Sequence, residues 1–334
     1  PFLCASEKKA LLVMGAVPQS IQDVLPGHVA TITAHHWSQK SYHIDILVPL
    51  AISREDAALR IRTHLAEGCA RRSISDVPVC TLLSGGIDSA AITWGLIPHV
   101  PTLTAYTAVF DPKSRDVRCA RLVARYLGIE LREVSIPVPT HDDLAEVVWY
   151  IEQPHKAQVE IGWACLCLAR QIHRDGFKVT FSGEGSDEMW GAYGFSYHQL
   201  QKQDWHAYRR DLFLAQHRKN FARCNKIFLA CGIECRLPFL HQPLVALTLR
   251  LPRSVVQDGL SRPKAVLQAA FRGTLPADVT DRPKVAFQDG LGLKAAIAHA
   301  LPDPERFYRA EYLRRFGPIQ HKPRPHASRH VAIR

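Results

Sequence analysis

Residues 83–89 read Leu-Ser-Gly-Gly-Ile-Asp-Ser. Leu83 is also the last residue of the continuous apolar run 77–83. An apolar run of this length bounded by glycine is typical of a buried strand in a parallel sheet. Helix-forming sequence follows from about Asp88 and must end before Pro98. Paired glycines let the backbone approach a ligand closely, and a helix N-terminus presents unpaired N–H groups to phosphate. The stretch predicts a strand, a phosphate-binding loop and a helix; taken alone, a tight turn with an N-cap explains it equally well.

Short β-rich segments alternate with helix-period segments on both sides of this loop, a pattern typical of a parallel sheet covered by helices. From Asp204 onward the sequence is mostly helical. The predicted fold class is therefore α/β: a parallel twisted sheet with helices on both faces, followed by a mostly helical C-terminal part. The expected strands are 77–83, 104–110, 131–136 and 177–181, and the expected helices are 52–70, 88–97, 115–127, 142–151 and 161–172.

Composition places the chain among ordinary globular proteins, with 334 residues that are 47% hydrophobic and 22% charged. It excludes a disordered chain, a collagen-like chain and a small disulfide scaffold. No apolar run approaches the roughly 18 residues of a membrane span, so no membrane segment is expected. The formal net charge of +11 suits a protein that handles ATP or pyrophosphate as well as one that binds nucleic acid. Nine scattered cysteines without a second pair at zinc spacing indicate reduced thiols and a cytoplasmic location.

A second loop carries the same kinds of residue, because residues 182–188 read Ser-Gly-Glu-Gly-Ser-Asp-Glu after the expected strand 177–181. Loops at the carboxyl ends of neighbouring parallel strands converge on one crevice, where they can share a nucleotide. We therefore expect Asp88 and Asp187 to pair around Mg²⁺ and Glu184 to be available for proton transfer. A solvated first turn of a helix is the alternative for these acids. The expected ATP-binding residues are Leu83, Ser84, Gly85, Gly86, Asp88, Ser89, Ser182 and Gly183.

Residues 75–89 closely resemble the ATP-pyrophosphatase (PP-loop) segment of the asparagine synthetase family, and residues 182–188 resemble its second signature. Asn225-Lys226, residues 232–240 and residues 282–284 are further matches, so the resemblance covers roughly residues 52–316. It implies an adenine nucleotide alpha-hydrolase-like fold and an AMP-forming ligase that uses ATP and Mg²⁺. The carboxylate substrate, aspartate in the family, becomes an acyl-AMP with loss of pyrophosphate, and ammonia or an amine then gives the amide, asparagine from aspartate.

The resemblance also assigns roles by position. Asp88 and Asp187 match the metal carboxylates, and Lys284 matches the lysine that stabilises pyrophosphate. Glu184 matches the residue proposed to take a proton from the attacking ammonia; related β-lactam-forming synthetases have Tyr there, so Glu184 favours an external amine over ring closure. For Lys284 the alternative is an ordinary surface lysine.

The chain divides into three parts. Residues 1–49 resemble the end of the family's N-terminal glutaminase domain plus a linker, 50–316 form the synthetase-like domain, and 317–334 read as a basic disordered tail. The nucleophilic Cys of the glutaminase domain is not in this sequence, so we expect this chain by itself to use free ammonia. A glutaminase domain or subunit as a partner, and a homodimer, remain open.

Several residues depart from the family pattern. Asn220 and His241 stand where Asp is usual, and Ala157, Gln158 and Glu160 stand where Thr and Arg are presented to the substrate. Glu160 in place of a cation is expected to repel a carboxylate substrate. A relative that activates another carboxylate, in peptide or secondary-metabolite biosynthesis, is therefore one alternative. A tRNA-associated PP-loop protein is another, although the absence of aromatics interleaved with cations disfavours nucleic acid.

Two basic positions have a simpler alternative. His217 and Arg223 match family positions, but a solvated charged face explains them as well.

Overall fold

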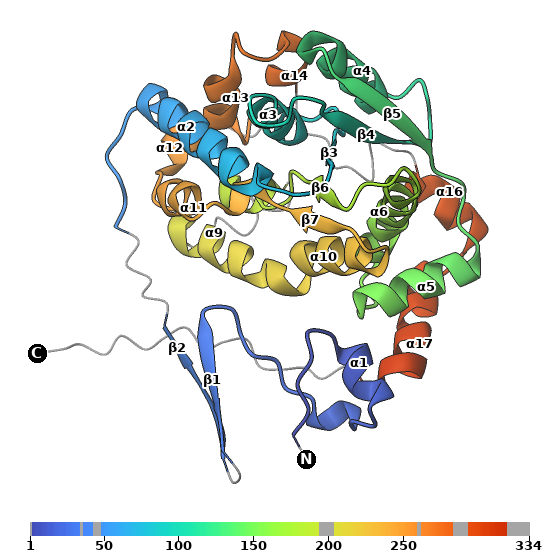
Figure 1. The fold of residues 1–334 in the computed structure, drawn as a ribbon. Coiled ribbons are helices and arrows are strands. Elements are labelled where there is room, and N and C mark those ends of the chain that lie inside the picture. The colour runs from blue at the N-terminus through green and yellow to red at the C-terminus, as the bar shows by residue number, and fades with distance from the viewer. Residues whose placement is uncertain are drawn as a thin grey trace, which may run out of the picture.

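The computed structural model describes residues 2–33, 36–42, 48–193, 204–258, 262–282 and 293–318. Its centre is a five-stranded sheet in the order β5-β4-β3-β6-β7, and every neighbouring pair is parallel (Figure 1). The predicted α/β fold with a parallel sheet is thus confirmed. The strands are β3 (Val79–Leu82), β4 (Thr104–Val109), β5 (Glu130–Ser135), β6 (Val179–Phe181) and β7 (Glu234–Arg236).

The strand order reverses at β3. The chain runs from β3 outward to β4 and β5, and then returns to place β6 on the other side of β3. In register, Thr81 of β3 pairs with Ala105 of β4 and with Phe181 of β6. In doubly wound sheets the crevice at such a switch point, beyond the carboxyl ends of the strands, is where ligands bind. The fold therefore directs attention to the loops that leave β3 and β6.

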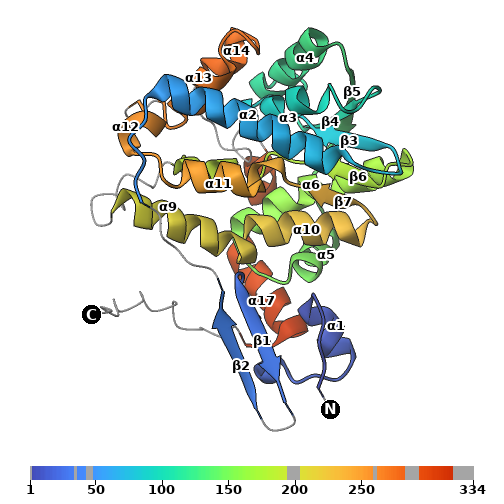
Figure 2. The ribbon, with the colours of Figure 1, turned by 60° about the vertical axis from the view of Figure 1, so that its left-hand side comes forward.

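Helices cover both faces of the sheet, and Figures 1 and 2 show them in two layers. Strand residues alternate between the layers, since Val79 and Ala105 contribute to one core and Cys80 and Tyr106 to the other. The first layer holds α2 (Arg54–Ser73), α3 (Ile87–Leu96), α4 (Arg115–Leu127) and α13 (Ala265–Phe271). The second holds α5 (His141–Ile151), α6 (Lys156–Arg174), α10 (Asn220–Ala230) and α17 (Pro304–Phe316).

Several helix ends follow directly from local sequence. The Ser114 side chain accepts a hydrogen bond from the Val117 N–H at the start of α4, and Gly128 ends that helix with a φ of 68°. Thr140 and Asp143 form a capping box at the start of α5. These signals explain why the helix predicted at 115–127 agrees with the structure at both ends.

The rest of the C-terminal part is mostly helical, as predicted, but β7 adds an edge strand that the sequence did not signal. Three residues are too short to show an alternating pattern. The tail predicted at 317–334 lies outside the described residues from position 319 onward. Other elements of the main domain are α7 (Ser186–Trp190), α9 (Trp205–Leu214), η2 (Ala215–Arg218), η3 (Pro238–Leu240), α11 (Gln242–Thr248), α12 (Arg253–Val256), α14 (Ala277–Thr280) and α16 (Leu293–Ala300).

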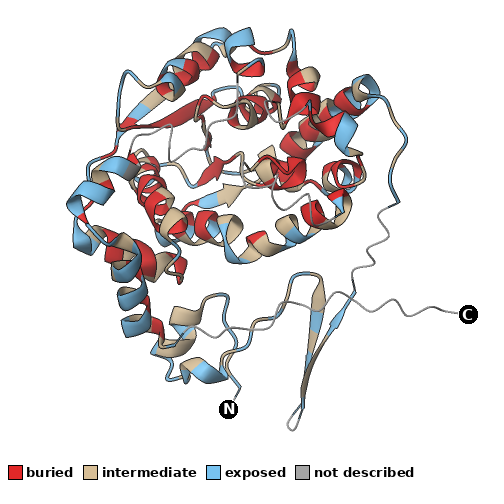
Figure 3. Ribbon diagram, turned by 180° about the vertical axis from the view of Figure 1, so that it is seen from behind, coloured by how far each residue is buried: buried red, intermediate tan, exposed pale blue. Residues whose placement is uncertain are grey.

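The N-terminal segment is different in character. It holds α1 (Lys8–Val13), η1 (Pro18–Ser20) and an antiparallel hairpin of β1 (His28–Ile32) and β2 (Trp37–Ser41). None of its described residues up to position 49 is buried, as Figure 3 shows. It is attached to the main domain where the Lys9 N–H donates to Glu152 Oε1 at 2.7 Å. The division at residue 49 stays a prediction.

Within the part of the chain that the structure describes, no helix has the length and apolar character needed to span a bilayer.

Candidate active site

The loop after β3 needs glycine for its backbone conformation. Gly85 has a φ of +79°, and a Cβ at this position would lie 2.2 Å from the Asp116 carbonyl oxygen, so only glycine fits. The Ser89 hydroxyl closes the loop, because it accepts from the Ser84 N–H and donates to the Gly86 carbonyl, each at 3.1 Å. Gly86, the N-cap residue of α3, has no side chain that could cap the helix, so the first N–H groups of α3 face the loop.

The loop after β6 packs directly on the first loop. A Cβ on Gly183 would lie 3.2 Å from both the Asp88 Cβ and the Ser89 nitrogen, so glycine permits this close approach. Ser186 Oγ donates to Asp88 Oδ1 at 2.6 Å and in turn accepts from the Trp190 indole at 2.7 Å. The two loops that the sequence singled out are therefore physically interlocked.

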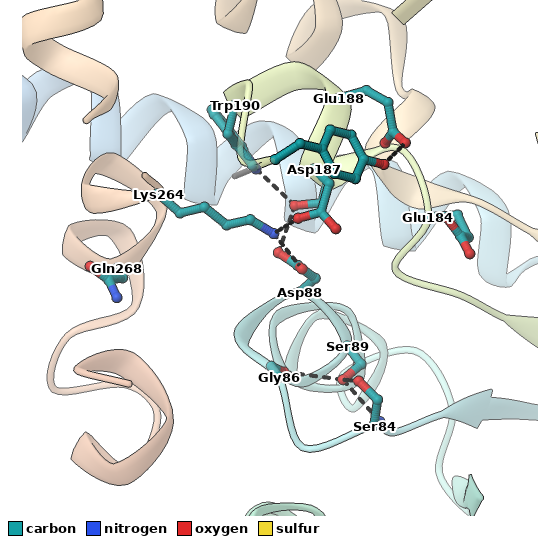
Figure 4. Close-up of polar contacts among 12 residues, drawn as sticks. Ser84, Gly86, Asp88, Ser89, Glu184, Asp187, Glu188, Trp190, Lys264 and Gln268 are labelled. Atoms are coloured by element: carbon teal, nitrogen blue, oxygen red, sulfur yellow. Dashed lines mark hydrogen bonds and ion pairs between the residues drawn. The ribbon is translucent and has the colours of Figure 1, made fainter. Parts of the chain in front are cut away.

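A buried lysine joins the acids of the two loops. Lys264, at the start of α13, places its Nζ 2.5 Å from Asp88 Oδ2 and also in an ion pair with Asp187 Oδ1 (Figure 4). Its side chain is only 3% exposed. Burial lowers the pKa of Lys264. The carboxylates of Asp187 and Asp88 raise it by more than burial lowers it, so the net pKa lies above its ordinary value. The lysine therefore stays protonated and compensates both acids.

The residues present fit an Mg²⁺ ion that arrives with a nucleotide. Asp88 and Asp187 converge on the Lys264 ammonium from adjacent loops, and both side chains remain partly exposed, so a metal ion can still reach them. Mg²⁺ is commonly held by one or two carboxylates, with phosphates and water as its other ligands. With two carboxylates from the chain, phosphate and water would complete the coordination. The metal role of the two acids stays a prediction.

Glu184 pairs with Arg223, for which a solvated charged face was an alternative in the sequence. Arg223 Nη2 of α10 donates to Glu184 Oε1, and the Arg223 side chain is 2% exposed, whereas that of Glu184 is 25% exposed. Arg223 is therefore buried and does not belong to a solvated face. Burial lowers its pKa, but the Glu184 carboxylate raises it, and the net pKa lies above the ordinary value. Nearby, burial together with the charges of Glu184 and Asp187 raises the pKa of Glu188 to about 7.

The residues that depart from the family pattern lie in different surroundings. Gln158 and Asn220 join Arg223 in one hydrogen-bond network beside Glu184. Glu160 is buried and bonded to Lys156 at 2.5 Å, so its charge is compensated and the expected repulsion of a carboxylate loses its basis. His241 packs on α2, where a Cβ on Gly68 would lie 2.9 Å from the His241 Cβ.

Of two further residues expected from the sequence, Lys284 and Ala157, the structure describes only Ala157. Lys284 lies outside the described residues. Two positions earlier, Arg282 pairs with Asp116 and donates to the Gly85 carbonyl at 3.3 Å, so residue 282 is bound to the first loop. Ala157 is only half-buried, at the start of α6.

Lys264 and the burial of Arg223 were missed by sequence reasoning. The available signal for Lys264 was a lysine placed directly before the apolar helix-forming run 265–271.

The position of Lys264 makes a prediction about stability. Lys264→Met keeps the side-chain length but leaves Asp88 and Asp187 facing each other without a counter-charge. We expect the free energy of unfolding to fall by about 3 kcal/mol, the lower end of the cost of breaking a buried ion pair, because the acids are partly exposed. Chemical denaturation measures this change. Adding Asp187→Asn should restore part of the loss, and a single variant within about 0.5 kcal/mol of the parent would contradict the ion-pair geometry.

Fold and site together define an α/β domain whose two interlocked Ser-Gly-Asp loops sit at the switch point of a parallel sheet. Comparison with known families identifies this architecture further. The family model for asparagine synthase matches residues 60–222 and 212–316. The chain belongs to the asparagine synthase family.

Individual relatives agree. The chain is 30% identical over 267 residues to asparagine synthetase B [glutamine-hydrolyzing] of Escherichia coli (strain K12), and the match covers 73% of this chain and 48% of that protein. It is 29% identical over 269 residues to an asparagine synthetase [glutamine-hydrolyzing] of Brassica oleracea, covering 73% of this chain and 46% of the relative. The chain thus spans about half the length of these relatives. Among solved structures, an NMN synthetase from Francisella tularensis matches at 15% identity with a TM-score of 0.29, covering 82% of this chain and 99% of that one.

Proposed function

We propose that this protein is an ATP-dependent, AMP-forming ligase that joins a carboxylate to ammonia or an amine. One observation supports the proposal most strongly: Asp88, Asp187 and Lys264 converge beside the open N-terminus of α3. Acids that hold a metal, a buried cation and free N–H groups are what a triphosphate requires, because phosphoryl and nucleotidyl transfer depend mainly on positioning and charge neutralisation.

Each group then has a role in the proposed reaction. The glycine loop and Ser84, Ser89, Ser182 and Gly183 cradle the nucleotide, and Asp88 and Asp187 would hold Mg²⁺, which neutralises phosphate charge when it is bound. A substrate carboxylate attacks the α-phosphorus, pyrophosphate leaves, and the acyl-AMP forms. Lys284, by its family position, stabilises the departing pyrophosphate, and the buried Lys264 holds Asp88 and Asp187 in place. Glu184 accepts the proton of the attacking amine, which then displaces AMP.

The first substrates to consider are aspartate and ammonia, since the relatives are named asparagine synthetases. Another carboxylate is a second candidate, and the neutral side chains of Gln158 and Asn220 beside Glu184 favour it. A glutaminase domain or subunit as the ammonia source is part of the proposal, because the relatives are named glutamine-hydrolyzing, and so is a homodimer. We also propose a cytoplasmic location, which the nine free thiols support.

Product analysis tests the proposal. The protein is incubated with ATP, Mg²⁺, ammonia and one carboxylate from a panel that includes aspartate. We expect carboxylate-dependent release of AMP and pyrophosphate in equal amounts, together with one amide per AMP. Release of ADP and inorganic phosphate would instead indicate an acyl-phosphate route and contradict the proposal. Nucleotide turnover that does not depend on any carboxylate would contradict it as well.

A further inference from the structure

One buried cation, the Arg223 guanidinium, holds the Glu184 carboxylate. The Glu184 side chain is 25% exposed, and its Oε1 accepts a hydrogen bond from Arg223 Nη2, whose side chain is 2% exposed. Glu184 can therefore reach a substrate only in the orientation that Arg223 permits. Whatever fixes the plane of the guanidinium also fixes the carboxylate, because a guanidinium presents its N–H groups in a rigid planar fork.

Two neutral amides fix that plane. Arg223 Nη1 donates to Gln158 Oε1 at 2.6 Å and to Asn220 Oδ1 at 3.1 Å. Gln158 Nε2 also donates to Asn220 Oδ1, at 2.8 Å, which closes a ring of hydrogen bonds between α6 and α10. We call Gln158, Asn220 and Arg223 the amide relay. Since neither amide carries a charge, the positive charge of Arg223 is compensated by Glu184 alone among the described residues that it contacts.

The direction of the Asn220 amide is set on its other side. Asn220 Nδ2 donates to Glu188 Oε1 at 2.7 Å, and Glu188 also accepts from the Tyr193 hydroxyl at 2.6 Å. The amide nitrogen must therefore face Glu188, and the amide oxygen must face Arg223. An acid at position 220 would place a carboxylate against Glu188 and would compete with Glu184 for Arg223. This explains physically why an amide, and not the Asp usual in the family, suits this position here.

We propose that Gln158 and Asn220 are positioning residues that hold Arg223 against Glu184 and thereby act only on the amide-forming half of the reaction. The proposal rests on the proposed function, and it deepens that function by separating two groups of residues. Asp88, Asp187 and Lys264 serve adenylation, whereas the amide relay serves the attack of the amine. Nothing in the relay contacts the first loop through a hydrogen bond among the described residues.

The test uses two nearly isosteric variants, Asn220→Asp and Gln158→Glu, each of which offers Arg223 a second carboxylate. Exchange of pyrophosphate into ATP reports adenylation, and amide release reports the second half-reaction. In both variants we expect exchange to stay within about threefold of the parent. The kcat for amide formation should fall by ~10–100-fold, the usual effect of losing an orienting partner, while the KM for the carboxylate stays unchanged. Gln242→Glu, the same amide-to-acid change at an exposed position at the start of α11, is the matched control and should change neither rate.

A double-variant cycle separates positioning from a general structural role. In the Glu184→Gln background, Asn220→Asp should cause little further loss, because the residue acts through Glu184. Independent, multiplicative losses would overturn the proposal. So would an equal fall of exchange and amide formation in the folded single variants, or an unchanged rate of amide formation in both. If Asn220→Asp does not fold, Gln158→Glu carries the same cycle. A parent protein without carboxylate-dependent exchange would overturn the proposed function and this proposal with it, whereas an active parent with equal losses overturns this proposal alone.

Discussion

Replacing Asp88 or Asp187 by alanine should abolish carboxylate-dependent exchange of pyrophosphate into ATP. Each substitution removes half of the carboxylate charge that would hold Mg²⁺, and the buried Lys264 then retains only one of its two partners. Charge neutralisation supplies most of the rate in this chemistry, so loss of the metal removes the first half-reaction. Radiolabelled pyrophosphate incorporation measures the effect directly.

The control is Asp142→Ala, which removes an exposed acid from the first turn of α5 and should leave exchange unchanged. Circular dichroism and denaturant unfolding show whether each variant is folded. Normal exchange in both folded site variants would remove Asp88 and Asp187 from the proposed metal site.

Glu184→Gln should separate the two half-reactions. Glutamine keeps the shape and hydrogen-bonding capacity of the side chain but cannot accept a proton from the amine. Pyrophosphate exchange should survive, because adenylation depends on Asp88, Asp187 and the lysines. Amide formation should fall by ~10²–10⁴-fold, the range for loss of a general base.

A variant of Lys284 should lose both half-reactions, because the amide forms only from the acyl-AMP. Lys284→Ala should lose exchange, since the leaving pyrophosphate is no longer neutralised. If Glu184→Gln lost both half-reactions equally, with its fold and ATP binding intact, Glu184 would be better assigned to the nucleotide scaffold than to proton transfer.

The fold could be predicted from sequence where local signals are strong. The helix at Arg115–Leu127 lies between a serine that caps it and a glycine that ends it, so both ends were predictable. The two loops were predictable because each follows a buried strand and contains glycine. Glycine is needed there because a Cβ would lie too close to neighbouring atoms. Strand β7 was not, because three residues at a sheet edge carry no period.

The charges of the site were less predictable, because burial of a charge depends on partners far along the chain. Lys264 binds Asp88 across 176 residues, and nothing in the residues around Lys264 indicates that pairing. Arg223 belongs to a helix with other polar residues and therefore looks exposed, but Gln158 and Glu184 enclose it from other elements. Sequence thus located the loops and acids, and the structure added the cations that hold them.

Oxygen transfer from the substrate tests the central claim most directly. A carboxylate substrate labelled with ¹⁸O in its carboxyl group, identified from the panel, is converted to the amide with ATP, Mg²⁺ and ammonia, and the nucleotide product is analysed by mass spectrometry. If the carboxylate attacks the α-phosphorus, its oxygen stays on phosphorus when the amine displaces the nucleotide, so each AMP should carry one ¹⁸O. Unlabelled AMP, or ¹⁸O found in inorganic phosphate alongside ADP, would contradict an acyl-AMP formed at this site.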